Sequence, residues 1–516
     1  MTPARWLAVL LPALALGLAW PALNGQFLSD DIGIMHWLLR WDAAGALWSS
    51  VFAKFAAGLD VPNHYYRPLA LLTYALDQRL FGWSPLGWHL TGFAIHLGNA
   101  VLVGAIARAL GGDGLRSVTA AGLFLLFPLA PEVSIWFAGR YDVLALSGML
   151  IAVYGHLRAT GFDRWRALSL FGFVLGLTAK EAAMPTPGLL VLASLLRSAP
   201  GELLLARLLR CARETWPVIA LFFAYLGLRV VLFGSALEVY PGSDPGAAIS
   251  VAEIARRLLA LTVIPRAVFA DALLAGALAL AAMLLATLLA LREAWHARNV
   301  AAQWLLPAAW LALSLLSLVP HLSGVLEHGE GGRFYYASGA WLALLMAGAV
   351  SPLRRRAATV AALLMLAAFA VAQQHALAQW ARAGDAMAKL LPQLSVAAAS
   401  LGDDEFALVV VPDHIGPVPF ARNAQGGIVM PPQQTANLLP RLVPLLPEAI
   451  ATWPQRIADG DVARIKQRDI APRLDAVFCF DPAHLRLHRA EQAADWREPE
   501  AFLRDVRHFT RSACAL

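Results

Sequence analysis

Two adjacent carboxylates, Asp30 and Asp31, follow an apolar stretch that ends at Leu23. A carboxylate held against a bound hydroxyl group can act as its general base. Apolar residues recur after the pair at close to helical spacing: Ile34, Leu38, Trp41, Trp48, Phe52 and Phe55. This pattern predicts an amphipathic helix whose tryptophans lie at the membrane surface. We therefore expect the carboxylate pair to be held beside a membrane.

Four later segments place a cation beside aromatic or acidic residues. They are HYYRP (64–68), FAGRYD (137–142), TAKE (178–181) and GRFYY (332–336), and their cations are Arg67, Arg140, Lys180 and Arg333. Guanidinium and ammonium groups are common protein ligands of phosphate. We expect these four cations to bind a phosphate. The expected substrate pocket contains Tyr65, Tyr66, Asp142, Glu181 and Tyr335.

The composition indicates a membrane protein. Hydrophobic residues make up 59% of the 516 residues and charged residues 15%, against roughly 45–50% and about 25% in soluble domains. The mean hydropathy is +0.59, so most of the chain is expected to lie in lipid. The net charge of +6 does not indicate nucleic acid, because the arginines gather in short loops between apolar stretches.

The apolar stretches predict a polytopic helical domain over 1–374 with about eleven spans. The predicted spans are 6–23, 86–109, 117–131, 140–157, 166–179, 182–196, 214–234, 268–291, 300–320, 334–351 and 357–373. Alternate loops are rich in arginine, which favours a cytoplasmic N-terminus. Residues 24–85 and 235–267 then form outer segments with surface helices. The acidic pair and the four cation segments fall on this same outer face.

The last part of the chain predicts a small soluble α/β domain over 395–516. FALVVVP (406–412) and AVFCF (476–480) are typical of buried strands, and 446–469 of a polar helix. The alternation of loops places this domain outside, in the periplasm of a Gram-negative cell. Cys479 and Cys514 would then share an oxidising compartment and could pair, whereas Cys211 lies inside.

These groups suit glycosyl transfer from a lipid-linked phosphate. The leaving phosphate has a pKa near ~6, so it departs without a general acid, but it needs positive charge to hold it. One carboxylate base suffices for an inverting, single displacement, whereas glycosidases use two carboxylates. No metal or other cofactor is expected.

The order of the motifs resembles a known family over about residues 1–350. The acidic pair is followed by HYYRPL, ALDQRLFGWSPLGWHL, PEVSIWFAGRYD, TAKE and RFYYAS. This order is similar to that of GT-C fold glycosyltransferases that use polyprenyl-phosphate sugars. It is closest to the protein O-mannosyltransferase and aminoarabinose-transferase branch, especially to bacterial relatives of the tetratricopeptide-bearing transmembrane O-mannosyltransferases.

The resemblance implies an integral enzyme of the bacterial inner membrane that takes its sugar from undecaprenyl phosphate. It implies that Asp30 is the base, that Asp31 supports it and that Arg67 contacts the donor phosphate. The chain departs from the family pattern, because its second acid is Asp instead of Glu and its tail is α/β instead of a repeat array. The sugar and the acceptor (protein, lipid or polysaccharide) therefore stay open.

Structural roles compete with these functional ones. Ser29 or Asp30 can cap a helix. Arg67 can extend to the membrane surface or pair with a loop carboxylate, and Arg333 can join an interfacial aromatic belt with Tyr335 and Tyr336. Local bridges can pair Arg140 with Asp142 and Lys180 with Glu181. We expect His89, His96 and Asn99 to form hydrogen bonds between helices, and no metal at His321, His328, Glu327 and Glu330.

Two other functions are compatible with the composition. A transporter or lipid flippase would place its ionisable residues near the middle of its spans, whereas here they gather at one face. A non-catalytic scaffold would depend on its tail for binding a partner, and Asp30 would be dispensable.

Overall fold

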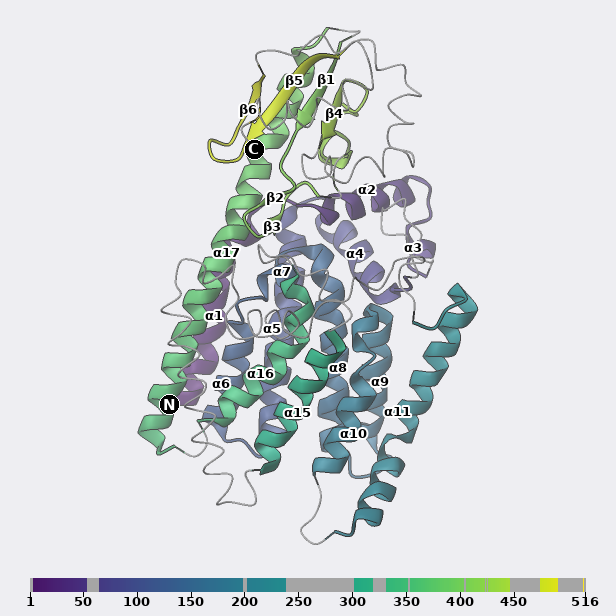
Figure 1. Ribbon diagram of the computed structural model, residues 1–516, viewed down its shortest axis with the longest axis vertical. Helices are drawn as coiled ribbons and strands as arrows, with labels where there is room; N and C mark the ends of the chain where they lie inside the picture. Colours follow the sequence, from purple (N-terminus) through teal and green to yellow (C-terminus); the bar gives the residue numbers. More distant parts are fainter. Residues whose placement is uncertain are drawn as a thin grey trace, which may run out of the picture. The chain divides into compact units, whose positions relative to one another are not determined.

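The computed structural model describes residues 3–52, 65–197, 202–237, 301–318, 331–350, 353–402, 405–422, 424, 426–445, 474–490 and 514. The chain divides into two compact units (Figure 1). The helical unit comprises Met1–Leu23, Trp48–Ala56 and Val61–Ala378. The α/β unit comprises Asn24–Leu47, Ala57–Asp60 and Gln379–Leu516.

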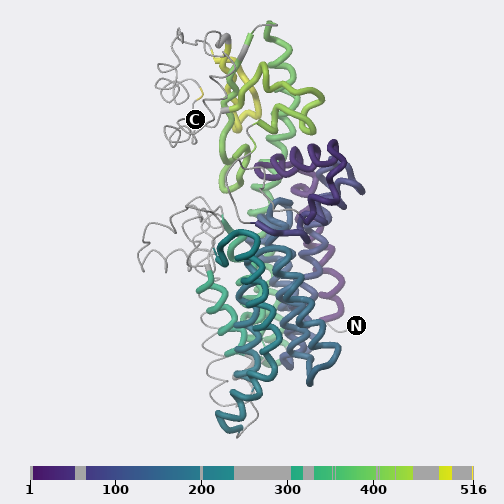
Figure 2. Tube along the Cα trace, turned by 90° about the vertical axis from the view of Figure 1, so that its right-hand side faces the viewer, coloured from purple at the N-terminus to yellow at the C-terminus, as the bar shows by residue number. Residues whose placement is uncertain are grey.

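The helical unit is built from helices that run roughly along a common direction in both views (Figure 1 and Figure 2). Its longer helices are α1 (Pro3–Leu23), α4 (Pro68–Phe81), α5 (Pro85–Ala109), α6 (Gly114–Leu125), α8 (Arg140–Arg158), α9 (Arg164–Ala179), α10 (Thr186–Leu196), α11 (Leu204–Phe233), α15 (Ala301–Leu318) and α16 (Tyr336–Gly348). Short turns of helix join them at α3 (Leu47–Ser50), α7 (Pro131–Ser134), η1 (Phe137–Gly139), η2 (Glu181–Ala183) and η4 (Gly332–Tyr335).

Five helices of the described residues are long and apolar enough to cross a membrane. They are Ala4–Leu23, Pro85–Ala109, Phe137–Arg158, Leu204–Phe233 and Arg356–Ala399. The predicted spans 117–131, 166–179, 182–196 and 334–351 form the shorter helices α6, α9, α10 and α16. The polytopic helical fold is thereby confirmed. The predicted span 268–291 and nearly all of the segment 235–267 lie outside the described residues, so the number of spans remains a prediction.

Small residues let α8 and α9 approach closely. A Cβ on Gly148 would lie 2.3 Å from the backbone nitrogen of Gly176, and one on Gly155 would lie 2.7 Å from that of Ser169. Helices packed this closely gain van der Waals contact without a hydrophobic driving force, as membrane helices must. The helix pair that results carries Arg140 and Asp142 at one end.

The predicted hydrogen-bonding roles of three polar residues inside the spans are confirmed. His89 bonds through Nδ1 to the carbonyl of Leu23 at 2.9 Å. His96 bonds through Nδ1 to the hydroxyl of Tyr336 at 2.7 Å. Asn99 donates to the carbonyl of Val143 at 3.0 Å. Each contact joins two helices, as expected for polar groups at membrane depth.

Arginines from the loops predicted to be cytoplasmic take part in one network between α8, α9, α10 and α11. Arg166 Nη1 lies 2.7 Å from His156 Nδ1, and His156 Nε2 lies 2.9 Å from the hydroxyl of Ser194. That hydroxyl donates to Glu214 at 2.6 Å, which lies 3.6 Å from Arg210. These residues lie at the ends of their helices away from Arg140 and Lys180, as the alternation of the loops predicts.

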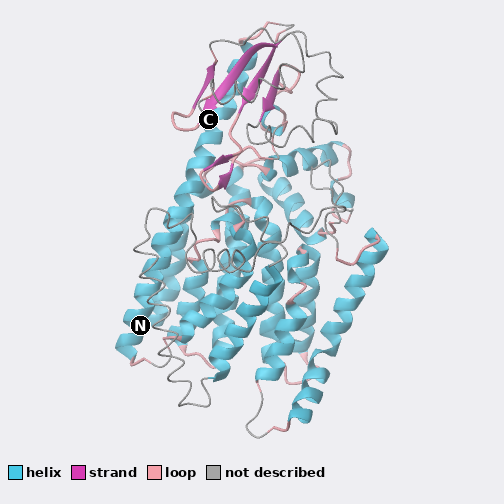
Figure 3. Ribbon diagram, in the orientation of Figure 1, coloured by secondary structure: helices cyan, strands magenta, loops and turns pink. Residues whose placement is uncertain are grey.

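The α/β unit contains a four-stranded sheet in the order β4-β1-β5-β6 (Figure 3). Its strands are β1 (Phe406–Val410), β4 (Leu442–Leu445), β5 (Leu474–Asp481) and β6 (Arg486–Arg489). β1 is parallel to β4 and to β5, and β6 is antiparallel to β5. The two predicted strands, 406–412 and 476–480, lie at the centre of this sheet, which confirms the α/β tail. The predicted helix region 446–469 lies outside the described residues.

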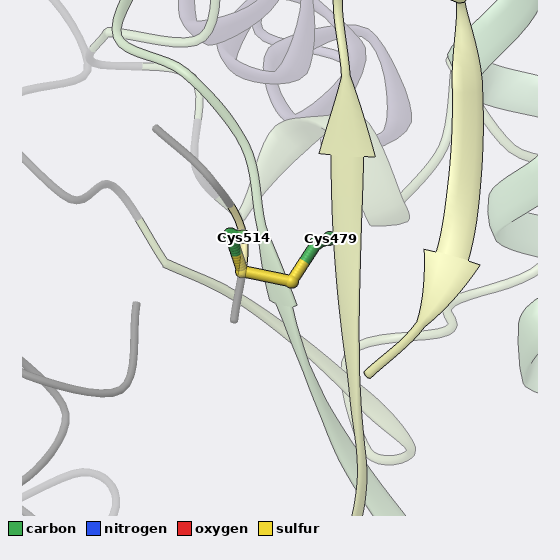
Figure 4. Close-up of a disulfide and its surroundings, with 2 residues drawn as sticks. All are labelled: Cys479 and Cys514. Carbon is green, nitrogen blue, oxygen red and sulfur yellow. A yellow bond between two sulfur atoms is a disulfide. The ribbon is translucent and has the colours of Figure 1, made fainter. Parts of the chain in front are cut away.

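A disulfide joins Cys479 of β5 to Cys514 (Figure 4). The Cα atoms of the two residues are 5.3 Å apart. The pairing considered from the sequence is therefore present, and Cys211 is a buried free thiol.

Two features differ from the sequence prediction. The predicted span 357–373 continues without a break as α17 (Arg355–Ala399), so this helix extends past residue 374, where the predicted helical domain ends. The acidic segment Asn24–Leu47 was placed with the membrane helices, but it belongs to the α/β unit. Hydropathy does not reveal where α17 ends, because the helix stays alanine-rich beyond the predicted span.

The amphipathic stretch after the acidic pair is also divided. It forms α2 (Asp30–Ala43) and the short α3 instead of one helix. Ile34 and Leu38 are buried within the protein, whereas Trp48 and Phe52 are exposed. The expected single stripe facing lipid is therefore wrong for α2.

Candidate functional site

A cluster of cations in the helical unit comes from the ends of separate helices. Arg67 precedes Pro68, the first residue of α4, and the proline keeps the Arg67 backbone out of the helix. Lys180 lies between α9 and η2, and Arg333 lies in η4. Arg229 lies in the last turns of α11. We call Arg67, Lys180, Arg229 and Arg333 the cation cluster.

Arg67 and Glu181 form a buried ion pair. Arg67 donates to Glu181 Oε2 from Nη2 at 2.8 Å and from Nε at 3.3 Å. Their side chains are only 8% and 11% exposed. The guanidinium also lies 3.8 Å from the ring centre of Tyr65 and 4.8 Å from that of Tyr141. Burial by itself lowers the pKa of Arg67, but Glu181 and these two tyrosines raise this pKa above its ordinary value. Arg67 is therefore permanently charged.

Glu181 is shared between two arginines. Arg229 donates to its other oxygen, Oε1, at 3.3 Å, and Arg229 also donates to the carbonyl of Ala236 at 2.7 Å. Arg229 is only 1% exposed. One carboxylate thus faces two buried guanidinium groups and holds them close together.

Lys180 pairs with Asp142 at the start of α8. Its ammonium group donates to both carboxylate oxygens at 2.8 Å and lies 5.6 Å from the ring centre of Phe334. The pKa of Lys180 is lowered, first by burial and then by the positive charges of Arg67 and Arg333, although Asp142 opposes the shift. Lys180 therefore lies within electrostatic range of both Arg67 and Arg333.

Arg333 pairs with Glu132 of α7 at 3.0 Å. The same carboxylate oxygen accepts a hydrogen bond from the backbone of Gly331 at 3.2 Å. The guanidinium lies 5.2 Å from the ring centre of Trp136 and 5.0 Å from that of Phe334. The backbone and the aromatic rings hold this arginine in one place.

Arg140 occupies a different environment. It is fully buried and forms an ion pair with Asp77 of α4 at 2.6 Å. It donates to the carbonyl of Trp88 at 2.8 Å and to the hydroxyl of Thr73 at 3.4 Å. These contacts tie α8 to α4 and α5. They suit a structural ion pair, in contrast to the phosphate ligand that the sequence predicted.

The carboxylates beside the cations pair over long distances in sequence. Asp142 was considered as a local partner of Arg140, and Glu181 as one of Lys180. Asp142 instead pairs with Lys180 and Glu181 with Arg67. Neighbouring side chains point in different directions on a helix, so each of these carboxylates pairs with a cation from another part of the chain.

The tyrosines of the predicted pocket lie at different depths. Tyr65 is buried against Arg67, and Tyr66 is half-buried. Tyr335 and Tyr336 are both buried, and the Tyr336 hydroxyl contacts His96 and Asn99. The alternative that these two tyrosines form an interfacial belt is therefore wrong. Tyr335 stays a predicted pocket residue.

The acidic pair lies in the α/β unit. Asp30 is the first residue of α2 and is half-buried, whereas Asp31 is buried and accepts from the backbone of Leu28 at 3.4 Å. Ser29 occupies the N-cap position, but its side chain makes no capping bond. The capping interpretation of Ser29 is thus wrong. That Asp30 and Arg67 serve one substrate remains a prediction.

Sequence reasoning missed three charged partners, namely Arg229, Asp77 and Glu132. A signal existed for Arg229, because a lone arginine in an apolar span must find an acidic or carbonyl partner. Asp77 and Glu132 lie inside motifs that were recognised, but no spacing rule links them to Arg140 or Arg333. The described residues contain no group of three metal-ligating side chains. The residues 319–330, with the histidines considered for metal, lie outside the described part.

The curated relatives of the chain include a human transferase, TMTC4, which is 24% identical over 220 residues. That match covers 38% of this chain and 30% of TMTC4. Tmtc1 of Drosophila melanogaster is 28% identical over 169 residues, covering 31% of this chain and 19% of that protein. These relatives are protein O-mannosyl-transferases. The resemblance inferred from the motifs is thereby confirmed, although the matches span less than a third of the relatives' length. No protein-family profile matches the chain.

The solved structures that the chain matches include ArnT from Cupriavidus metallidurans. Its apo structure has a TM-score of 0.47 and 16% identity, and the match covers 86% of this chain and 90% of ArnT. ArnT bound to undecaprenyl phosphate has a TM-score of 0.40 and 17% identity, with 87% and 91% covered.

Proposed function

We propose that the protein is an inverting glycosyltransferase that moves a sugar from a polyprenyl-phosphate donor to an acceptor at the outer face of the inner membrane. The cation cluster carries this proposal. Arg67, Lys180, Arg229 and Arg333 come from separate helix ends, and three of them share an electrostatic environment. The protein O-mannosyl-transferase relatives support a sugar-transfer reaction.

The cluster suits a phosphate because fixed guanidinium and ammonium groups bind phosphate oxygens. Glu181 holds Arg67 and Arg229 close together. Two nitrogens of Arg67 are engaged by Glu181. The third nitrogen of Arg67, Nη1, makes no hydrogen bond to another described residue. Fixed cations of this kind stabilise charge that develops on a leaving phosphate without reorganising during the reaction.

The proposed reaction is a single displacement. The acceptor hydroxyl loses its proton to Asp30 while its oxygen forms a bond to the anomeric carbon. The bond between that carbon and the phosphate oxygen breaks, and the polyprenyl phosphate leaves with the electron pair. The N-terminal end of α2 favours an ionised carboxylate at Asp30, because the helix dipole is positive there. Arg67 and its neighbours retain the phosphate.

The location proposed is the bacterial inner membrane, with the N-terminus in the cytoplasm and the α/β unit in the periplasm. The disulfide between Cys479 and Cys514 supports an oxidising compartment for that unit. The proposed donor is an undecaprenyl-phosphate sugar. The experiment therefore has to vary both the sugar and the acceptor.

The test is to incubate the purified protein with a panel of polyprenyl-phosphate sugars and to measure released polyprenyl phosphate. We expect release with at least one donor. Arg67→Met should weaken donor binding about 10- to 100-fold, because a hydrogen bond to a charged group contributes about 1.5–3 kcal/mol. Arg79→Met is the matched control, since Arg79 is an exposed arginine at the other end of α4 and should leave binding unchanged.

A lipid flippase would move the donor across vesicles without releasing polyprenyl phosphate. Transbilayer movement without release, together with equal donor affinity in wild type and Arg67→Met, would contradict the proposed function.

A further inference from the structure

The residue before the proposed base has a strained backbone. Ser29 has φ 50° and ψ −126°, a conformation that side chains other than glycine rarely adopt. Such a conformation is strained and persists only where the surroundings fix it. Something other than local preference must therefore hold the chain at the point where α2 begins.

Residues of the C-terminal part of the α/β unit hold Ser29. The Ser29 backbone N–H donates to the carbonyl of Phe420 at 2.8 Å. Its hydroxyl donates to the carbonyl of Arg422 at 2.7 Å. Just before it, Gln26 N–H donates to the carbonyl of Gly384 at 3.4 Å. The backbone N–H and the hydroxyl group of Ser29 thus both bind residues almost 400 positions later in the chain.

The same part of the unit also contacts the face of α2. Ile32 is fully buried, and a Cβ added to Gly427 would lie 2.5 Å from its Cγ2 atom. His36 Nδ1 lies 3.3 Å from the carbonyl of Pro431, and Gln433 donates to the sulfur of Met35 at 3.5 Å. These contacts fix the rotation of α2 about its axis.

We propose that Phe420, Arg422, Gly427, Pro431 and Gln433 form a positioning element that sets the direction of the Asp30 carboxylate. It fixes the backbone at Ser29 and the rotation of α2, and these two constraints fix the direction in which the Asp30 side chain leaves the helix. This role rests on the proposed function, which makes Asp30 the base. Ser29, Ile32 and Gly427 are positioning residues, because none of them has to touch the substrate.

Gly427→Ala in the full-length protein tests this role. The new methyl group must push Ile32, and therefore α2, out of place. A displacement of about 1 Å can cost about 100-fold in rate, so we expect kcat to fall at least tenfold. The Michaelis constant for the donor should stay within about twofold, because the cation cluster is unchanged. Gly426→Ala is the matched control, since its Cβ would meet only the flexible end of Met430 at 3.3 Å.

Two further variants keep the test decisive. Ile32→Ala combined with Gly427→Ala should recover part of the lost kcat, because it removes the atom that the new methyl group meets. Ser29→Ala removes the hydroxyl contact with Arg422 without filling space, and should lower kcat even if Gly427→Ala does not fold. Thermal unfolding identifies variants that have lost the fold.

The outcomes separate the two proposals. If Asp30→Asn is inactive but Gly427→Ala and Ser29→Ala both have the kcat of the wild type, the positioning role is wrong and the proposed function stands. If Asp30→Asn is fully active, the assignment of the base is wrong, whatever the other variants do.

Discussion

Among single residues, Lys180 is the member of the cation cluster whose charge depends on pH. Its pKa is lowered by burial and by Arg67 and Arg333, whereas arginine stays charged throughout. A lysine with a lowered pKa loses its proton at a lower pH than an ordinary lysine. Its contribution to phosphate binding is therefore present below that pKa and is lost as the pH rises through it.

We predict that donor affinity falls on the alkaline side at a pH below 10.5, the ordinary pKa of lysine. Lys180→Arg should move this fall to higher pH, because a guanidinium keeps its charge. The measurement is the donor dissociation constant as a function of pH for both proteins. Lys389→Arg, at an exposed lysine of α17, is the control and should leave the profile unchanged. Identical profiles for Lys180→Arg and wild type would show that Lys180 does not contact the phosphate.

At this same scale, the sequence identifies charged residues better than it identifies their partners. Arg67, Lys180 and Arg333 stand out because each is an isolated cation beside aromatic or acidic residues. Their partners could not be predicted, because Glu181, Asp142 and Glu132 come from other helices, and helix packing decides which ends meet. Arg140 has the same local signature as the others, yet it is buried in an ion pair with Asp77.

At the scale of elements, the contact between α8 and α9 determines where Asp142 and Lys180 meet. Asp142 lies in the first turn of α8, and Lys180 follows the last residue of α9. Their ion pair therefore depends on the spacing of the two helices. Gly148 makes this spacing possible, since a Cβ there would lie 2.3 Å from the Gly176 nitrogen.

We predict that Gly148→Ala destabilises the helical unit by about 1–3 kcal/mol, the usual cost of overpacking. Its melting temperature in detergent should fall. Gly98→Ala is the matched control, because Gly98 lies in a helix with nothing within 4 Å of a new Cβ. That variant should be neutral or slightly stabilised, since alanine is the better helix former. Equal melting temperatures for the two variants would rule out close packing as the determinant.

Hydropathy predicts most helices of the described part, because burial in lipid demands apolar runs of defined length. It fails where a helix passes from one environment to another. The residues of α17 remain alanine- and leucine-rich beyond 374, so composition gives no sign that the helix continues into the α/β unit. It fails again at α2, where Ile34 and Leu38 suit a membrane surface and a protein interior equally well.

At the scale of the whole molecule, the residues proposed to bind the phosphate and the residue proposed as base are assigned to different units. The cation cluster belongs to the helical unit and the acidic pair to the α/β unit. The sequence predicted one catalytic domain followed by a separate tail, because segments 24–47 and 384–433 are far apart in the chain. The tail thereby gains an expected role in catalysis, in contrast to the scaffold alternative, in which Asp30 would be dispensable.

This division predicts that binding and chemistry can be separated. The phosphate is proposed to bind to residues of the helical unit, so a change at Asp30 should leave donor binding intact. The same change should stop proton removal from the acceptor, because an amide is not a general base.

The most direct measurement compares Asp30→Asn with the wild type in one assay that reports both bound donor and transferred sugar. We predict that the variant binds the polyprenyl-phosphate sugar with wild-type affinity and unfolds at the wild-type temperature, while transfer falls below about 1% of the wild-type rate, a loss typical of removing a general base. Transfer at the wild-type rate by Asp30→Asn would contradict the mechanism.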